Sequence, residues 1–399
     1  MLQNTPLTAE DVKQKQLAQH CYWDESTQTL WIDGRKVMPE IGVVEVPSWD
    51  SLSMSSSEIP DYPNQLKVLD WSNYSQLSCW RKQIPKWVQE SCALFPSHQL
   101  KLLHYAGKYP QVLELLDHSP MLAWRLICTN LAEPEIVALL TGKRQKIVAQ
   151  VGWPGKEETV KFLRNLRLRM VNEKIAEQVE ICLMDDQRLN ALQALPRINS
   201  MALSLAASFP ELIGSRLHLA LAQLPCRPMQ CQSMVSLLED AYRLAEWLQL
   251  SQVEVDKIGL CRYLVEVTKC YQQWFTLGRE AFAMKKTGRI KEITEASCLG
   301  LKLSLSRELT VLSDWQDWIR FSDLQTHAWW TSEAVEEHAL LAWQDADGVW
   351  GALIQYQHKE DLNAAHLIIR VRGEENVLPG AKQLSDLHLW LANRLPKSD

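Results

Sequence analysis

The chain has 399 residues, of which 46% are hydrophobic and 23% charged, with a formal net charge of −6. This composition excludes a disordered chain, suggests two or three domains at roughly 100–200 residues each, and argues against a surface that coats nucleic acid as a whole. The first residues contain no apolar signal core, and no later window approaches the roughly 18 apolar residues of a membrane span. The ten cysteines lie mostly in helical patterns, where thiols behave as small buried hydrophobes. We therefore expect a cytoplasmic protein with no membrane partner.

The N-terminal part combines a predicted β-hairpin with a predicted linker. In residues 21–37, aromatic and β-branched residues stand on both sides of a Ser/Thr/Gln turn, which is typical of two short paired strands. We assign residues 1–45 to this hairpin segment. Residues 46–67 combine serine, proline and acidic residues without hydrophobic periodicity. Such a composition predicts a flexible linker.

Residues 68–287 have the pattern of consecutive short helices. Proline stands where three of these helices would begin, at Pro96, Pro110 and Pro120, and proline favours the first turn of a helix. Leucines recur at spacings of three and four, at Leu100, Leu103, Leu113, Leu116, Leu122 and Leu126. No fixed repeat length is present. We predict an irregular helical bundle or solenoid.

The pattern changes in residues 288–399. Two β-type runs are joined through Asp345, Asp347 and Gly348, which predicts a hairpin, and a further strand and an amphipathic closing helix follow. We expect a small α+β domain here. The fold class expected for the whole chain is therefore mainly α: an irregular helical bundle or solenoid, then a small α+β C-terminal domain, with a short N-terminal β-hairpin. The following tryptophans of this part are expected in a core or at a partner interface: Trp315, Trp318, Trp329, Trp330, Trp343 and Trp350.

The stretch 152–169, "GWPGKEETVKFLRNLRLR", resembles a phosphate loop at first sight. A phosphate loop has glycine, four residues, then Gly-Lys and Ser or Thr. Counted from Lys156, the first glycine is replaced by Gln150 and the hydroxyl residue by Glu157. The signature fails at both ends, so we expect no nucleotide site. We interpret Gly155 as the end of one element, before a helix that begins with acidic residues.

The same region carries a local excess of positive charge. Residues 141–174 hold nine basic residues against three acidic ones, although the whole chain is negative. We expect Val160, Leu163, Leu166 and Met170 to point to the core, with Lys161 and Arg164 on the opposite face. A basic face can bind the phosphates of a nucleic acid, or it can simply be a solvated helix face. The candidate binding residues are Lys143, Arg144, Lys146, Lys161, Arg164, Arg167 and Arg169.

Metal and catalytic motifs are weak. Cys226 and Cys231 lie in a proline-rich turn with His218 upstream, but no second Cys or His pair follows at zinc-finger spacing. None of the common hydrolase, metalloprotease or kinase motifs occurs. We therefore predict no metal and no cofactor, and we assign no catalytic residue. Four histidines without motif spacing are interpreted as surface or capping residues: His98, His104, His358 and His366.

Three stretches carry a resemblance to a known family. They are "GWPGKEETVKFLRNL" at 152–166, "VTKCYQQW" at 267–274 and "LIIRVRGEENVLPGAKQLSDLHLWL" at 367–391. In this order they resemble the PcfJ-like proteins, a family encoded on bacterial plasmids, phages and chromosomes, over about residues 90–399. The C-terminal residues of the family-like motif are Arg372, Gly373, Asn376 and Trp390.

The resemblance leaves two hypotheses for function. The family pattern has a His/Asn-Cys pair after a Leu-Gly, where this chain has Ser304 and Leu305. The missing pair favours a non-catalytic adaptor of a bacterial mobile-element or antiviral-defence system, with a protein partner and, through the basic segment, a nucleic-acid partner. The alternative is a PcfJ-like enzyme that acts on a nucleic acid or nucleotide with polar residues around Arg372, Asn376 and His366.

Overall fold

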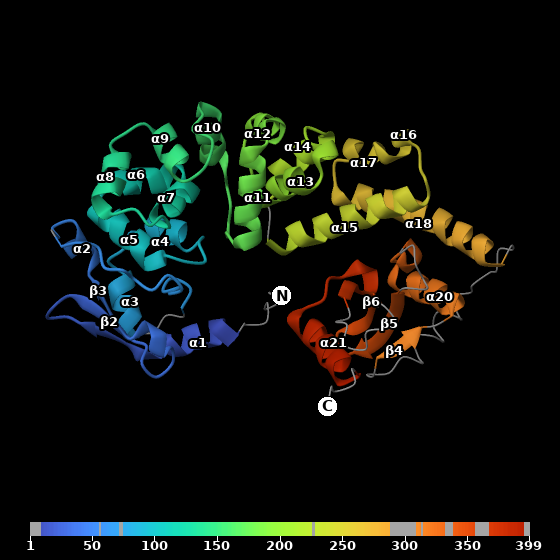
Figure 1. Cartoon of the computed structure of the whole chain (residues 1–399), viewed down its shortest axis with the longest axis horizontal. Helices are drawn as coiled ribbons and strands as arrows, with labels where there is room; N and C mark the ends of the chain where they lie inside the picture. The colour runs from blue at the N-terminus through green and yellow to red at the C-terminus, as the bar shows by residue number, and fades with distance from the viewer. Residues whose placement is uncertain are drawn as a thin grey trace. The chain divides into compact units, whose positions relative to one another are not determined.

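The computed structural model describes residues 9–55, 57–71, 75–225, 228–287, 309–312, 314–331, 338–355 and 367–394. The chain forms two compact units, Leu7–Cys231 and Gln232–Asp399. The structure is mainly helical with two small antiparallel sheets, one near each end of the chain (Figure 1). This confirms the predicted fold class. No helix in the described part of the chain combines the length and apolar character needed to cross a membrane.

The first unit begins with helix α1 (Ala9–Leu17) and a three-stranded sheet. Strands β1 (Cys21–Asp24) and β2 (Thr29–Asp33) form the predicted hairpin, with Cys21 opposite Ile32. A third strand, β3 (Val43–Pro47), pairs antiparallel with β2 and was not predicted. Its Val44 and Val46 are buried while Val43 and Glu45 are exposed, the two-residue alternation of a half-buried strand.

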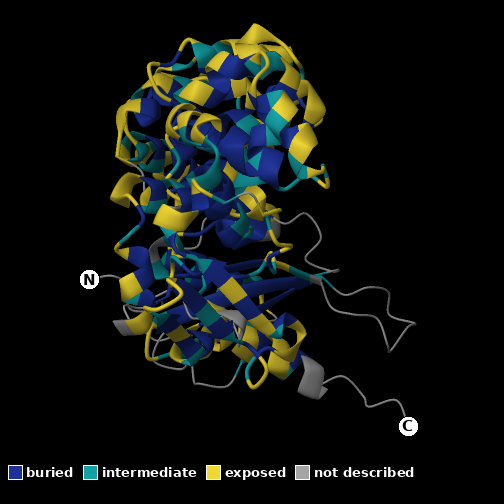
Figure 2. Ribbon diagram, turned by 90° about the vertical axis from the view of Figure 1, so that its left-hand side faces the viewer, coloured by how far each residue is buried: buried dark blue, intermediate teal, exposed yellow. Residues whose placement is uncertain are grey.

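Short helices make up the rest of the first unit. Proline begins two of them as predicted, at Pro110 and Pro120, whereas Pro96 stands three residues before the next helix start. The predicted leucine stripe is buried except for Leu113, which is partly exposed. In Figure 2 buried residues line the inner faces of these helices and exposed residues their outer faces. The helices are α2 (Trp49–Leu52), α3 (Ser75–Arg81), α4 (Lys86–Cys92), α5 (Gln99–Lys108), α6 (Pro110–His118), α7 (Pro120–Ile127), α8 (Glu133–Leu140), α9 (Arg144–Gln150), α10 (Glu157–Asn165), α11 (Glu173–Met184), α12 (Asp186–Gln193), α13 (Ser200–Ser208) and α14 (Arg216–Gln223).

The segment 46–67, expected to be a flexible linker, is instead packed onto the first unit. Leu52, Tyr62 and Leu66 are all at most 4% exposed. The Tyr62 hydroxyl hydrogen-bonds to His104 Nδ1 at 2.8 Å. The anchoring side chains are spaced without helix or strand period, so a search for periodicity cannot find them. The N-terminal hairpin and the helices that follow therefore belong to one core.

The second unit joins long helices to the C-terminal sheet. The expected boundary at residue 288 separates these two parts, but the structure places both in one unit. Phe275 and Phe282 of α18 pack against Trp330, with ring centroids 4.9 and 6.0 Å away. Arg279 of α18 pairs with Asp323 at 2.8 Å. The helices are α15 (Pro228–Trp247), α16 (Gln252–Val255), α17 (Lys257–Leu260), α18 (Leu264–Thr287), α20 (Trp315–Gln325) and α21 (Ala381–Arg394).

The C-terminal sheet is antiparallel in the order β4-β5-β6-β7. Its strands are β4 (Thr310–Leu312), β5 (His338–Asp345), β6 (Gly348–Gln355) and β7 (Leu367–Gly373). The predicted hairpin is β5–β6, with Asp345 opposite Gly348, and β7 is the predicted further strand. One apolar cluster joins the sheet to α20 and a second joins it to α21. The central strands are therefore buried on both faces.

The tryptophans of the second unit are core residues, one of the two expected roles. Of the six tryptophans considered in the sequence analysis, five are at most 5% exposed and Trp315 is partly exposed. Trp343 and Trp350 lie opposite each other on β5 and β6. Buried rings of this size contribute much of a domain's apolar contact area. A role in stacking on nucleic-acid bases would require accessible rings, which these five are not.

Candidate functional site

Two groups of charged side chains are candidates for a functional site, one in each unit. The first is the basic segment of α9, α10 and the residues after α10. The prediction that apolar residues of this segment face the core is confirmed for Val160, Leu163 and Leu166, which are at most 8% exposed. It is wrong for Met170, which is 43% exposed. Helix α10 ends at Asn165, so the helical spacing used for the prediction does not extend to Met170.

Three of the seven predicted binding residues already have partners within the protein. Arg144 pairs with Glu114 at 2.7 Å and Lys161 with Glu157 at 3.0 Å. The Arg167 guanidinium donates to the backbone carbonyls of Arg164 and Leu166. The two carboxylate pairs reduce the positive charge that the segment can offer to a ligand, and the backbone contacts hold the Arg167 side chain in place.

Four predicted residues remain exposed without a carboxylate partner among the described residues. Two stand at the start of α9 and two at and after the end of α10, and these two helices pack against each other. We call these four the free basic residues: Lys143, Lys146, Arg164 and Arg169. Charged side chains that are fully hydrated and unpaired are available to a phosphate ligand at little desolvation cost.

The loop between α9 and α10 has the geometry of a helix end. Gly152 has φ +88°, and the backbone N–H groups of Gly152 and Trp153 donate to Ala149 and Val148, which is the Schellman arrangement. Gly152, rather than the predicted Gly155, therefore ends α9. Lys156 pairs with Asp186 at 3.0 Å. Lys156 is therefore bound to a carboxylate of the protein, whereas the lysine of a phosphate loop binds the ligand.

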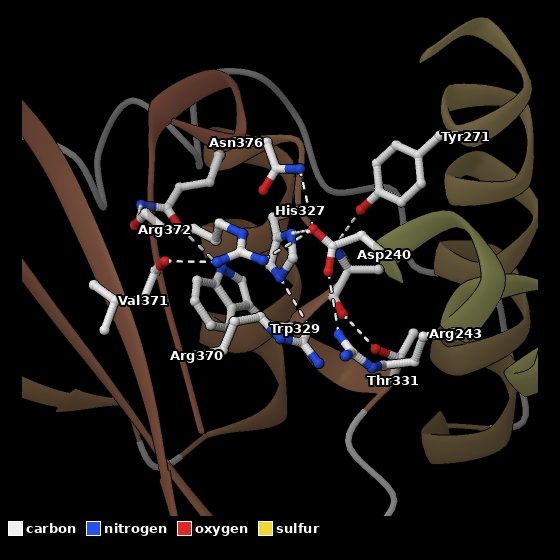
Figure 3. Close-up of polar contacts among 12 residues, drawn as sticks. Asp240, Arg243, Tyr271, His327, Trp329, Thr331, Arg370, Val371, Arg372 and Asn376 are labelled. Atoms are coloured by element: carbon white, nitrogen blue, oxygen red, sulfur yellow. Dashed lines mark hydrogen bonds and ion pairs between the residues drawn. The ribbon is translucent and has the colours of Figure 1, made fainter. Parts of the chain in front are cut away.

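The second candidate lies in Gln232–Asp399 and is centred on Asp240 of α15. Two predicted motif residues, Arg372 and Asn376, meet at this carboxylate (Figure 3). The other two lie elsewhere. Gly373 packs under the Trp350 ring, and Trp390 of α21 contributes to the apolar cluster under the sheet.

Asp240 is 3% exposed and receives contacts from four side chains. Its Oδ2 accepts from Asn376 Nδ2 at 3.1 Å and lies 3.5 Å from Arg372 Nη2. Its Oδ1 accepts from Arg243 Nη1 at 3.1 Å. Burial alone would raise the pKa of Asp240, but the surrounding positive charges and hydrogen bonds outweigh burial, so the pKa lies below its ordinary value. The carboxylate is therefore ionised at neutral pH.

His327 lies between Asp240 and Arg370 and is fully buried. Burial, reinforced by the neighbouring arginines, lowers the pKa of His327 well below its ordinary value despite the attraction of Asp240. The neutral ring accepts a hydrogen bond at Nε2 from Arg370 Nη1 at 2.9 Å. Its proton therefore resides on Nδ1, which lies 3.6 Å from Asp240 Oδ2 and has no hydrogen-bond partner in the described structure.

Arg370 and Arg372 project from β7, two residues apart and on one face of the strand. Both are at most 8% exposed. Burial, followed by the charge of Arg243, lowers the pKa of Arg370 to about 10, which still leaves it protonated at pH 7. Three guanidinium groups thus surround one carboxylate. We call these groups, together with His327 and Asn376, the Asp240 cluster.

Four residues of the Asp240 cluster were not predicted from the sequence: Asp240, Arg243, His327 and Arg370. One local signal was present: the apolar strand "LIIRVRG" carries two arginines at alternate positions, so both must share one face. The histidine predictions divide. His98 stands at the N-cap position of α5, but its side chain makes no capping hydrogen bond there. His104 is buried, so the prediction for this residue was wrong. His358 and His366 lie outside the described residues.

Comparisons with known proteins add no family or fold assignment. No family model, no curated protein and no solved structure matches the chain. Across the described ranges, no group of three or more histidine, cysteine, aspartate or glutamate side chains is arranged to hold a metal ion. Function must therefore be argued from the two charged groups themselves.

Proposed function

We propose that this chain is a non-catalytic binding component that holds the phosphate backbone of a nucleic acid on the free basic residues. The single observation that carries the proposal is that Lys143, Lys146, Arg164 and Arg169 are exposed and unpaired in the described structure. Arg144 and Lys161 of the same segment pair with carboxylates within the protein. Four exposed cations thus remain on two helices that pack together, in a chain whose net charge is negative.

Electrostatics supports a backbone contact rather than base recognition. Lysine and arginine side chains bind phosphates independently of sequence and release counterions as they do so. Five of the six tryptophans considered for base stacking are buried: Trp318, Trp329, Trp330, Trp343 and Trp350. We therefore expect weak sequence preference and a strong dependence of affinity on salt.

The resemblance to PcfJ-like proteins supports a role as an adaptor in a bacterial mobile-element or defence system. An adaptor needs a second contact, and we propose a protein partner for it. The Leu7–Cys231 unit would hold the nucleic acid in this arrangement. The missing family pair at Ser304 and Leu305 lies outside the described residues, and it supports binding rather than chemistry.

A second candidate function is an enzyme of the PcfJ-like kind. The observation that favours it is the meeting of Arg372 and Asn376 at Asp240. Catalysis also requires a group that can reach substrate, whereas Asp240 and His327 are at most 3% exposed. His366, the third residue of this hypothesis, lies outside the described residues. Binding is therefore the function that we retain.

Charge reversal of the free basic residues tests the proposal. A variant with Lys143, Lys146, Arg164 and Arg169 changed to Glu should lose retention of DNA and RNA at 50 mM salt, while its circular dichroism stays unchanged because all four side chains are exposed. A matched control reverses four exposed lysines elsewhere on the same unit: Lys13, Lys15, Lys36 and Lys82. The control should retain nucleic acid. Equal retention by both variants would refute the proposal.

A further inference from the structure

The Asp240 cluster contains more buried positive charge than its described partners neutralise. Three guanidinium groups, those of Arg243, Arg370 and Arg372, share the single carboxylate of Asp240. The neutral His327 adds no charge. Because the Arg243 side chain is 37% exposed, the buried groups are Arg370, Arg372 and Asp240. They leave a local excess of one buried positive charge, although buried ions are ordinarily paired.

The arginines also have incomplete hydrogen bonding. Arg372 Nε is buried and has no partner in the described structure, and the same holds for His327 Nδ1 and Asn376 Oδ1. Arg370 makes one hydrogen bond, to the His327 ring, and pairs with no carboxylate among the described residues. With a pKa of about 10, it cannot relieve the excess by losing its proton at pH 7.

We propose that the Asp240 cluster binds a small tetrahedral oxyanion, a phosphate ion or the phosphate group of a monoester, between Arg370 and Arg372. A planar guanidinium presents a fork of N–H donors that matches the oxygens of phosphate. Two forks project from the same face of β7 toward α15 (Figure 3). His327 accepts a hydrogen bond from Arg370, and Asp240 lies 3.5 Å from Arg372 Nη2, so each guanidinium is held in place.

One side of the cluster is open to solvent. The Arg243 side chain is 37% exposed, and Asn376 is half-buried. An anion entering past these residues would approach the arginines without unfolding of the sheet. The proposal is independent of nucleic-acid binding by the free basic residues, which lie in the other unit.

The test uses the full chain in a buffer free of phosphate, at constant ionic strength. Inorganic phosphate should bind at one site by calorimetry and should raise Tm by about 5 °C at 100 times its Kd. AMP serves as a second probe. A stronger response to AMP than to phosphate identifies a monoester as the source of the anion, and an equal or weaker response identifies the free ion. Acetate should give no shift, and a response to acetate equal to that of phosphate would contradict a tetrahedral ligand.

Two variants and one control locate the site. Arg370→Gln should abolish the phosphate response, whereas Lys382→Gln removes an exposed cation of α21 in the same unit and should leave it intact. Arg370→Lys keeps the charge but loses the guanidinium fork, so its affinity for phosphate should fall at least tenfold. This variant tests the site if Arg370→Gln does not fold. Absence of phosphate binding to the native chain, or equal affinity in Arg370→Lys, would overturn the proposal.

Discussion

The side-chain amide of Asn376 donates a hydrogen bond to the carboxylate of Asp240 at 3.1 Å, across 136 residues of sequence. The contact connects the end of the C-terminal sheet to α15 within Gln232–Asp399. Because Asp240 also pairs with Arg243 and Arg372, the stability of this unit should depend on one carboxylate.

Asp240→Asn removes that charge and leaves the arginines without an anion. The expected loss of stability is about 3–5 kcal/mol, the usual effect of breaking a buried ion pair from one side. Urea unfolding followed by tryptophan fluorescence measures it. Asp317→Asn is the control, since Asp317 pairs with Arg320 at a half-exposed site and should cost about 0–1 kcal/mol. Equal losses in the two variants would contradict a special role for Asp240.

The buried His104 predicts a loss of stability in mild acid. Burial lowers its pKa from 6.5 to about 4. The unfolded chain therefore binds a proton on His104 at a higher pH than the folded chain does. The stability due to the neutral ring is fully present above pH 6.5 and is lost as pH falls toward 4, by about 2 kcal/mol at pH 5.

Unfolding free energies at pH 7 and pH 5 test this assignment. His104→Gln cannot titrate, so its stability should fall less than that of the native chain between the two values. The comparison isolates His104 from His218 and His327, whose pKa values are also lowered by burial. The same pH dependence in the variant and the native chain would show that His104 is not responsible.

Close packing at Gly351 predicts that no side chain is tolerated there. A Cβ at this position would lie 2.5 Å from Phe321 Cε1 and 2.7 Å from Trp329 Cζ2. Gly351→Ala should therefore destabilise the chain by about 1–3 kcal/mol through overpacking. At Gly380 a Cβ would meet only the end of the Gln383 side chain, so Gly380→Ala should cost less. Thermal unfolding of the two variants measures the difference in stability. If Gly351→Ala unfolds at the same temperature as the native chain, the sheet and α20 are packed less tightly than the structure indicates.

The packing of segment 46–67 predicts that two of its apolar residues differ in their contribution to stability. Leu66 is fully buried, whereas Met54 is 87% exposed. Leu66→Ala should destabilise the chain by about 2–5 kcal/mol and should expose the segment to limited proteolysis. Met54→Ala should stay within about 0.5 kcal/mol of the native chain. Rapid cleavage of the native chain in this segment would restore the linker interpretation.

Local signals in the sequence predicted most of the elements. The turn at Asp347 and Gly348 specified the hairpin of β5 and β6, and proline marked the starts of α6 and α7. These features depend on neighbouring residues, which a single sequence displays directly.

Long-range contacts explain what the sequence could not predict. The alternation of Arg370 and Arg372 placed them on one face of a strand, but it gave neither their burial nor their partner, because Asp240 lies 132 residues before Arg372. Tyr62 and Leu66 anchor an irregular segment whose composition resembles that of a linker. Pairing within the basic segment likewise depends on Glu114, 30 residues before Arg144.

The dependence of nucleic-acid affinity on salt tests the central claim most directly. Four phosphate contacts, one for each free basic residue, predict that the logarithm of the binding constant falls against the logarithm of salt concentration with a slope of about −3.6 for duplex DNA and about −2.8 for a single strand. Fluorescence anisotropy with labelled oligonucleotides between 50 and 200 mM salt measures both slopes on the native chain. Slopes near these values, reduced toward zero by the fourfold charge reversal, are the predicted result. An affinity that is undetectable at 50 mM salt, or one that does not change with salt, would contradict it.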